Sequence, residues 1–133
     1  NRGQIDAEEI IYSLSKNPEL NTYDLNIGLT KQDIYYKNMS HIFGLAQTNG
    51  KILALSTFRL ERDLHFNTIS QNLYQERVFK ELLHELGHIS GLSHCDINTC
   101  VMSFSSNVAK VDLKLPMFCQ NCNDVISYNN TGR

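Results

Sequence analysis

Hydrophobic and polar residues near the start of the chain change from a helical to an alternating pattern. The first pattern has the i, i+3, i+4, i+7 spacing of an amphipathic helix, and its apolar members are Ala7, Ile10, Ile11 and Leu14. Asp6 and Glu9 have the spacing of a capping box that begins this helix, and Asn17-Pro18 ends it. Apolar and polar positions then alternate over residues 23–29, which predicts a strand.

Two further apolar runs predict a β-hairpin. Residues 43–47 and 52–58 lie on either side of Asn49-Gly50, a dipeptide that favours a tight turn between antiparallel strands. We therefore expect this pair to contain an antiparallel edge of a sheet.

A long helical pattern follows over residues 72–90. Its predicted buried stripe consists of Tyr74, Val78, Leu82, Leu86 and Ile89. Asn72 with Gln75 is expected to cap its start, and Gly91 is expected to end it in a left-handed conformation. Beyond it we expect sparse regular structure and a short helix over residues 117–128. Strands, a core helix and an irregular tail together predict the α/β (α+β) class.

The composition is that of an ordinary globular protein. The 133 residues suffice for one domain with a core, 41% of them are hydrophobic and 20% charged, and the net charge is −2. This charge gives no electrostatic basis for binding nucleic acid or an anionic membrane, and no apolar run approaches the roughly 20 residues of a membrane helix. We expect a single monomeric domain over residues 1–133. Because the chain begins at Asn1 without a methionine, we also expect it to be a fragment.

Residues 84–95, HELGHISGLSHC, carry the most chemical information. His84 and His88 are one helical turn apart, so both imidazoles can meet one metal ion, and Glu85 beside them can act on a water molecule there. Gly91 supplies the turn that brings back His94 as a third ligand. Three imidazoles leave one coordination position open, which is typical of catalytic zinc with a carboxylate as general base.

The alternative interpretation is that the histidines form an ordinary helix face. A bare His-Glu-x-x-His motif occurs on helices by chance, but the glycine and third histidine at fixed offsets favour a metal site. Gly87 costs about 1 kcal/mol relative to alanine inside a helix, which indicates that another segment approaches closely there. His41 and His65 have no partner pattern, and we expect them at the surface or at strand ends.

Four cysteines cluster near the end of the chain: Cys95, Cys100, Cys119 and Cys122. An even number permits two disulfides, but the clustering and the two-residue gap in Cys119-x-x-Cys122 favour zinc. Zinc-bound thiolates are typical of a reducing compartment, so we expect a cytoplasmic protein.

Together these residues resemble the archaemetzincin family, within the metzincin clan of zinc metallopeptidases. The extended histidine motif is that of the clan, and the family pattern continues through Cys95, Cys100, Met102, Cys119 and Cys122. The similarity covers residues 77–122, with looser similarity at residues 43–46. The resemblance implies a catalytic zinc on the three histidines with Glu85 as general base, and a structural zinc on the four cysteines. Because His94 adjoins Cys95, we expect the structural ion to position the third catalytic ligand.

The resemblance also implies an architecture. A twisted mixed sheet and two main helices lie above a zinc cleft in the upper part, residues 1–91, and a zinc-tethered C-terminal subdomain forms the lower part, residues 92–133. Met102 would form an apolar floor beneath the catalytic metal. Phe104 stands where some metzincins have a metal-reaching tyrosine. Because family domains usually begin with a strand before the first helix, an N-terminal strand is expected to be missing.

The implied function is a zinc-dependent metallopeptidase that hydrolyses peptide bonds through metal-activated water. An extended peptide would bind along the edge strand at residues 43–47. The alternative is a two-zinc peptide-binding or regulatory module with little turnover. A purely structural zinc protein is disfavoured because Glu85 is present at the base position.

Overall fold

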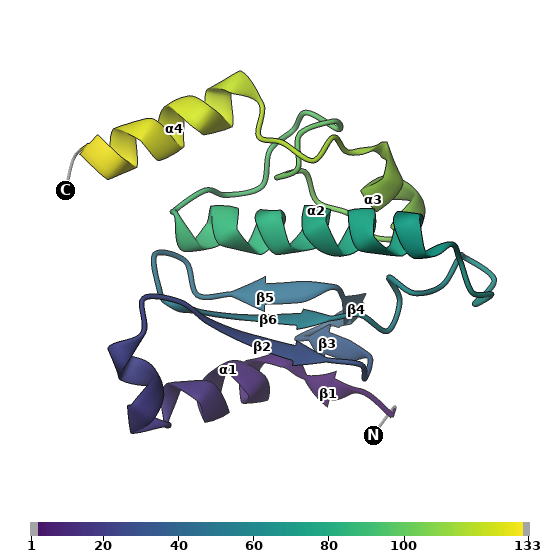
Figure 1. Cartoon of the computed structure of the whole chain (residues 1–133), viewed down its shortest axis with the longest axis horizontal. Helices are drawn as coiled ribbons and strands as arrows, with labels where there is room; N and C mark the ends of the chain where they lie inside the picture. The colour runs from purple at the N-terminus through teal and green to yellow at the C-terminus, as the bar shows by residue number, and fades with distance from the viewer. Residues whose placement is uncertain (1–2, 132–133) are drawn as a thin grey trace.

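The computed structural model describes residues 3–131, and helices cover both faces of its strands (Figure 1). The long helix α2 (Gln71–Ile89) lies between the strands and the C-terminal segment, which contains α3 (Val108–Leu113) and α4 (Gln120–Thr131). The first helix, α1 (Ala7–Ser15), covers the opposite face of the strands. The predicted mixed α/β class is confirmed.

Within the described residues, six short strands form two three-stranded sheets. They are β1 (Ile5–Asp6), β2 (Asn26–Thr30), β3 (Ile34–Tyr36), β4 (Met39–Ile42), β5 (Gly44–Ala46) and β6 (Ile52–Ser56). One sheet has the order β1-β3-β4 and the other β2-β6-β5. In the second sheet β6 pairs in parallel with β2 and antiparallel with β5, so the predicted hairpin is confirmed and β5 is an edge strand. Asn49 in its turn has a φ of 57°.

The first helix begins where the sequence predicts. Asp6 is its N-cap, and its carboxylate accepts a hydrogen bond from the Glu8 backbone N–H at 3.0 Å. The helix ends at Ser15, and Pro18 then begins a short 3₁₀ turn. The described residues start at Gly3, so Asn1, on which the fragment prediction depends, lies outside them.

The predicted alternating strand is present as β2, but its apolar face is not the buried one. Its apolar side chains Ile27 and Leu29 are exposed, whereas a Cβ at Gly28 would lie 2.8 Å from Leu14 of α1. Gly28 therefore lets α1 pack closely against this strand. The other long helix, α2, packs on β5 and β6 at the centre and opposite edge of the sheet.

The predicted extent of α2 is confirmed to within one residue at each end, but the predicted capping by Asn72 is wrong. Ser70 is the N-cap, because its Oγ accepts a hydrogen bond from the Leu73 N–H at 3.2 Å and the helix begins at Gln71, before Asn72. Gly91 follows the helix with a φ of 99°, and the next residue returns to the last turn through a Leu92 N–H bond to the Gly87 carbonyl at 2.9 Å.

The predicted buried stripe of α2 is also wrong. Its apolar members are only half-buried, and the fully buried residues are Arg77, Lys80, Glu81, His84, Glu85 and Gly87. The helix lies between two layers, and buried polar groups on it find partners in the C-terminal segment: Arg77 pairs with Asp112 at 2.8 Å, for example. A polar helix face can be buried where each charge is paired.

The C-terminal segment has more regular structure than expected. The helix α3 was not predicted, since it has only six residues. Its N-cap is Asn107, whose side chain accepts a hydrogen bond from Lys110 N–H at 3.1 Å. The helix predicted over residues 117–128 is α4, which begins three residues later. Within residues 3–131, no helix is long and apolar enough to cross a membrane.

Candidate metal centres

Three imidazoles converge at the C-terminal half of α2. His84 and His88 project from one face of the helix, and the turn at Gly91 returns the chain so that His94 joins them. One nitrogen from each ring lies within 4.8 Å of the others. The ring centroids are 4.8 Å apart for His84 and His88, and 5.0 Å apart for His88 and His94. The sequence-predicted histidine cluster is therefore brought together.

Hydrogen bonds orient two of these rings for metal binding. Nδ1 of His84 lies 2.7 Å from the Val101 carbonyl oxygen, and Nδ1 of His88 lies 2.7 Å from the Leu92 carbonyl oxygen. A carbonyl only accepts, so each Nδ1 carries the proton and donates it, which leaves Nε2 with its lone pair. Burial, aided by the nearby positive charge of Lys114, lowers the pKa of His84 to about 3. Its imidazole is therefore neutral at pH 7, as metal ligation requires.

Glu85 is packed between α2 and the edge strand. A Cβ at Gly44 of β5 would lie 2.9 Å from both Cγ and Oε2 of Glu85, so only glycine fits without displacing the carboxylate. Burial raises the pKa of Glu85 to about 8 in the metal-free protein, and the carboxylate of Glu81 adds to this. A carboxylate with a raised pKa is a suitable proton acceptor near neutral pH.

The histidines and Glu85 line a cavity of about 290 Å³ beside the edge strand β5. Its wall also contains residues that were not identified as site residues from the sequence, among them Glu81, His41 and Ser105. Among the residues described, Ser105 Oγ is the buried side-chain oxygen without a hydrogen-bond partner. His41 had been expected merely at the surface or a strand end, whereas His65 does lie in an exposed loop.

Met102, which the family resemblance assigns to the floor of the site, is fully buried and packs against Gly87 of α2. A Cβ at Gly87 would overlap Met102 Sδ and lie 3.1 Å from a ring carbon of Phe118, so the close approach predicted from this glycine is present. Phe104 lies in the wall of the same cavity, with its ring centroid 5.5 Å from that of His94. It supplies an apolar surface and no hydroxyl.

Replacing Gly87 with alanine is expected to lower the free energy of unfolding by up to about 2 kcal/mol. Overpacking against Met102 and Phe118 costs about 1–3 kcal/mol, which is offset in part by a gain in helix propensity of about 1 kcal/mol. Denaturant titration of the zinc-loaded protein measures the difference. Gln75→Ala, at an exposed position of α2, is the control and should change stability by less than about 0.5 kcal/mol. A stabilised Gly87→Ala variant would contradict the close packing.

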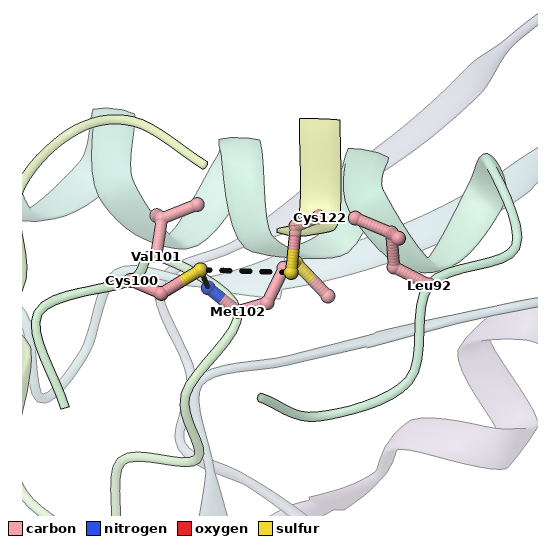
Figure 2. Packing of buried hydrophobic residues seen from close by; sticks show 5 residues of the cluster. All are labelled: Leu92, Cys100, Val101, Met102 and Cys122. Carbon is pink, nitrogen blue, oxygen red and sulfur yellow. Dashed lines mark hydrogen bonds between the residues drawn. The ribbon is translucent and has the colours of Figure 1, made fainter. Parts of the chain in front are cut away.

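The four cysteines form a second cluster. All four Sγ atoms lie within 4.8 Å of one another, and the thiols are free. The Sγ atoms of Cys95 and Cys119 are 3.9 Å apart, and those of Cys100 and Cys122 are 3.7 Å apart (Figure 2). A tetrahedron with zinc–sulfur bonds of about 2.3 Å has edges of about 3.8 Å. The separations therefore fit a closed zinc site and are too long for disulfides.

Backbone N–H groups point at these sulfurs. Cys100 Sγ accepts from the N–H groups of Met102 and Cys119, each at 3.4 Å. The Cys122 N–H lowers the pKa of the Cys119 thiol to about 7. Such donors favour the thiolate form that binds metal. The N–H of Cys95 also bonds the Met102 carbonyl at 2.9 Å, which links the two clusters.

Comparison with known proteins identifies a family for the chain. Residues 2–128 match the model of peptidase family M54. The chain is 38% identical over 128 residues to the archaemetzincin of Haloquadratum walsbyi, covering 94% of this chain and 72% of that protein. For several curated archaemetzincins the matched segment spans 52% to 72% of their length.

Solved structures are similar over nearly the whole chain. The crystal structure of archaemetzincin from Methanopyrus kandleri has a TM-score of 0.87 and 39% identity, covering 98% of this chain and 68% of that one. A zinc-dependent peptidase from Methanocorpusculum labreanum has a TM-score of 0.83 and 26% identity, covering 94% and 75%. The chain therefore belongs to peptidase family M54, the archaemetzincins, a family of zinc-dependent metallopeptidases.

Proposed function

We propose that this chain hydrolyses peptide bonds with two zinc ions. His84, His88 and His94 would hold the catalytic ion, and the four cysteines would hold the structural one. The observation that carries the proposal is the convergence of three imidazole nitrogens beside the buried carboxylate of Glu85, in a cavity along an open strand edge. The similarity to a protein described as a zinc-dependent peptidase supports it.

Zinc, when bound, supplies a Lewis acid that polarises the scissile carbonyl and makes water a stronger acid. The remaining steps belong to the residues of the chain. Glu85 accepts the proton of the attacking water and returns it to the leaving amine. The outer edge of β5 pairs with an extended substrate through backbone hydrogen bonds, and Gly44 brings that strand close to Glu85. Met102 fills the space beneath the histidine rings.

The cleft would lie between an upper part, residues 1–91, and a lower part, residues 92–133. The substrates would be peptides or proteins, and the chain would act as a monomer. Four free thiols in one cluster support a cytoplasmic location, because a reducing compartment maintains thiolate ligands.

Metal counting and a cleavage assay test the function. The purified protein is expected to contain two zinc ions per chain by elemental mass spectrometry, and to cleave members of a mixed peptide library. A chelator that removes the weaker zinc should stop cleavage, and added zinc should restore it. One zinc per chain would contradict the two-site proposal. Two zinc ions without cleavage would favour the binding-module alternative.

A further inference from the structure

The helix α2 offers the histidine site a fourth ligand. Glu81-Leu82-Leu83-His84 is a Glu-x-x-His sequence, and at this i, i+3 spacing a carboxylate and an imidazole on one helix can bind the same metal ion. His88 lies one turn further along the same face. The side chain of Glu81 lines the same cavity as His84 and His88.

The carboxylate of Glu81 is nevertheless kept out of the histidine cluster. Among residues 3–131, the ligand atoms that gather there come from the three histidines. Glu81 Oε2 instead accepts a hydrogen bond from Lys114 Nζ at 3.2 Å, and the two side chains are 4% and 0% exposed. Lys114 directly follows α3, and its side chain extends from there to Glu81.

Burial in this segment is the opposite of what hydropathy predicts, because the charged residue is buried and its apolar neighbours are exposed. Lys114 is 2% exposed, while its neighbours Leu113 and Leu115 are 65% and 51% exposed. The Leu115 N–H bonds the Thr99 carbonyl at 2.8 Å, which fixes this orientation of the backbone. Burying an ion pair rarely stabilises a fold more than apolar residues of similar size would. Stability alone therefore does not explain why the chain exposes two leucines and buries a lysine.

Attachment of α3 to α2 does not explain the pair either. Arg77 makes a two-bond contact with Asp112, and Lys80 donates to the carbonyls of Val111 and Asp112. The carboxylate of Asp112 is 33% exposed, so this attachment keeps one partner hydrated. Among the ion pairs of the described residues, the pair of Lys114 and Glu81 is the one with both partners buried.

We propose that Lys114 is a positioning residue that withholds Glu81 from the histidine site. A site closed by four protein ligands is structural, whereas three ligands leave a position for water and substrate. By binding Glu81, Lys114 keeps that position open and leaves Glu85 as the one carboxylate available to the cleft. The inference rests on the proposed function in one respect, namely that zinc occupies the histidines.

Lys114→Met in the full chain tests the proposal. With Glu81 released, the weaker of the two zinc ions should be held about tenfold more tightly, while peptide turnover falls by about tenfold. Zinc affinity is measured by competition with a chelator such as dipicolinate, followed by elemental mass spectrometry. The double variant Glu81→Gln with Lys114→Met removes the competing carboxylate, so it should reverse both changes. A purely structural role would weaken zinc binding in the single variant and could not produce this reversal.

Arg77→Met is the matched control, because it breaks the neighbouring ion pair of the same helix. It should lower stability and leave zinc affinity unchanged. If Lys114→Met does not fold, Lys114→Gln gives the milder comparison, since its amide can donate to Glu81 without a charge. Unchanged or weaker zinc binding in the folded Lys114→Met variant would overturn the proposal. A double variant with the same zinc affinity and turnover as Lys114→Met would also overturn it. The affinity measurement needs no turnover, so it decides the role of Lys114 even if the chain proves to be a binding module.

Discussion

Glu85→Gln is expected to lower peptide cleavage by about 10²- to 10⁴-fold, the usual contribution of a general base. Glutamine has nearly the same shape, so it fits between α2 and Gly44, where a larger change would displace the edge strand. It cannot accept a proton from water at neutral pH. The zinc content should stay at two ions per chain, because the proposed ligands of the first site are the neighbouring histidines and not Glu85.

The measurement is kcat/KM on one peptide selected from the library, with zinc content determined on the same samples. Glu76→Gln is the matched control, since this carboxylate lies two turns earlier on α2 and is 52% exposed. It should retain the cleavage rate of the unmodified chain. Cleavage by Glu85→Gln at the original rate would remove Glu85 from the base role. Loss of a zinc ion from that variant would instead indicate that Glu85 helps to hold the metal.

The sequence predicted those parts of the site that depend on local spacing. His84 and His88 are placed by the helical repeat, and His94 by a glycine whose positive φ could be inferred from its position. The hairpin of β5 and β6 was likewise predictable from Asn49-Gly50, because turn chemistry is local. The spacing of the four cysteines favoured zinc over disulfides, and the family resemblance assigned all four to one structural ion.

The parts that failed depend on contacts between distant segments. Hydropathy assigned the buried face of α2 to apolar residues, whereas Arg77 and Glu81 are buried because Asp112 and Lys114 meet them from about 33 to 35 positions away. No local pattern in residues 113–115 indicates that the lysine faces inward. His41 was dismissed for the same reason: its role in the cleft wall depends on how β4 lies beside α2.

Short elements were missed for a different reason. β1 and β3 have only two and three residues, so neither contains a full period of alternation. β1 pairs with β3 and β3 pairs with β4, and this pairing holds the short strands in place. β2 was predicted as a strand, but its apolar face is exposed. Alternation predicts a strand without indicating which of its faces is covered.

Cys119→Ala is expected to remove the structural zinc and to weaken the histidine site as well. Structural zinc contributes about 10–16 kcal/mol of apparent binding free energy in zinc-finger peptides, so losing one of four ligands removes a large share of the stability of the C-terminal segment. The remaining sulfurs, including the buried Cys100 and Cys122, would lose the ion that gathers them. The variant should contain at most one zinc per chain and unfold at a lower temperature.

The weakening of the histidine site follows from the covalent connection between the two clusters. Cys95 directly follows His94, and its N–H bonds the Met102 carbonyl. Releasing Cys95 from the structural ion therefore loosens the loop that carries the third ligand. We expect the affinity of the histidine site for zinc to fall by about tenfold or more, the usual effect of losing a group that orients a metal ligand. Chelator competition on the folded variant measures this change.

Gln120→Ala provides the control, because Gln120 is exposed and adjoins Cys119 but offers no metal ligand. It should keep both zinc ions and the original unfolding temperature. If Cys119→Ala loses its structural ion yet binds the second zinc with unchanged affinity, the two sites are independent and the adjacency of His94 and Cys95 has no energetic consequence. If both properties fall together, the cysteine cluster maintains the geometry of the catalytic site, and the two zinc sites form one functional unit.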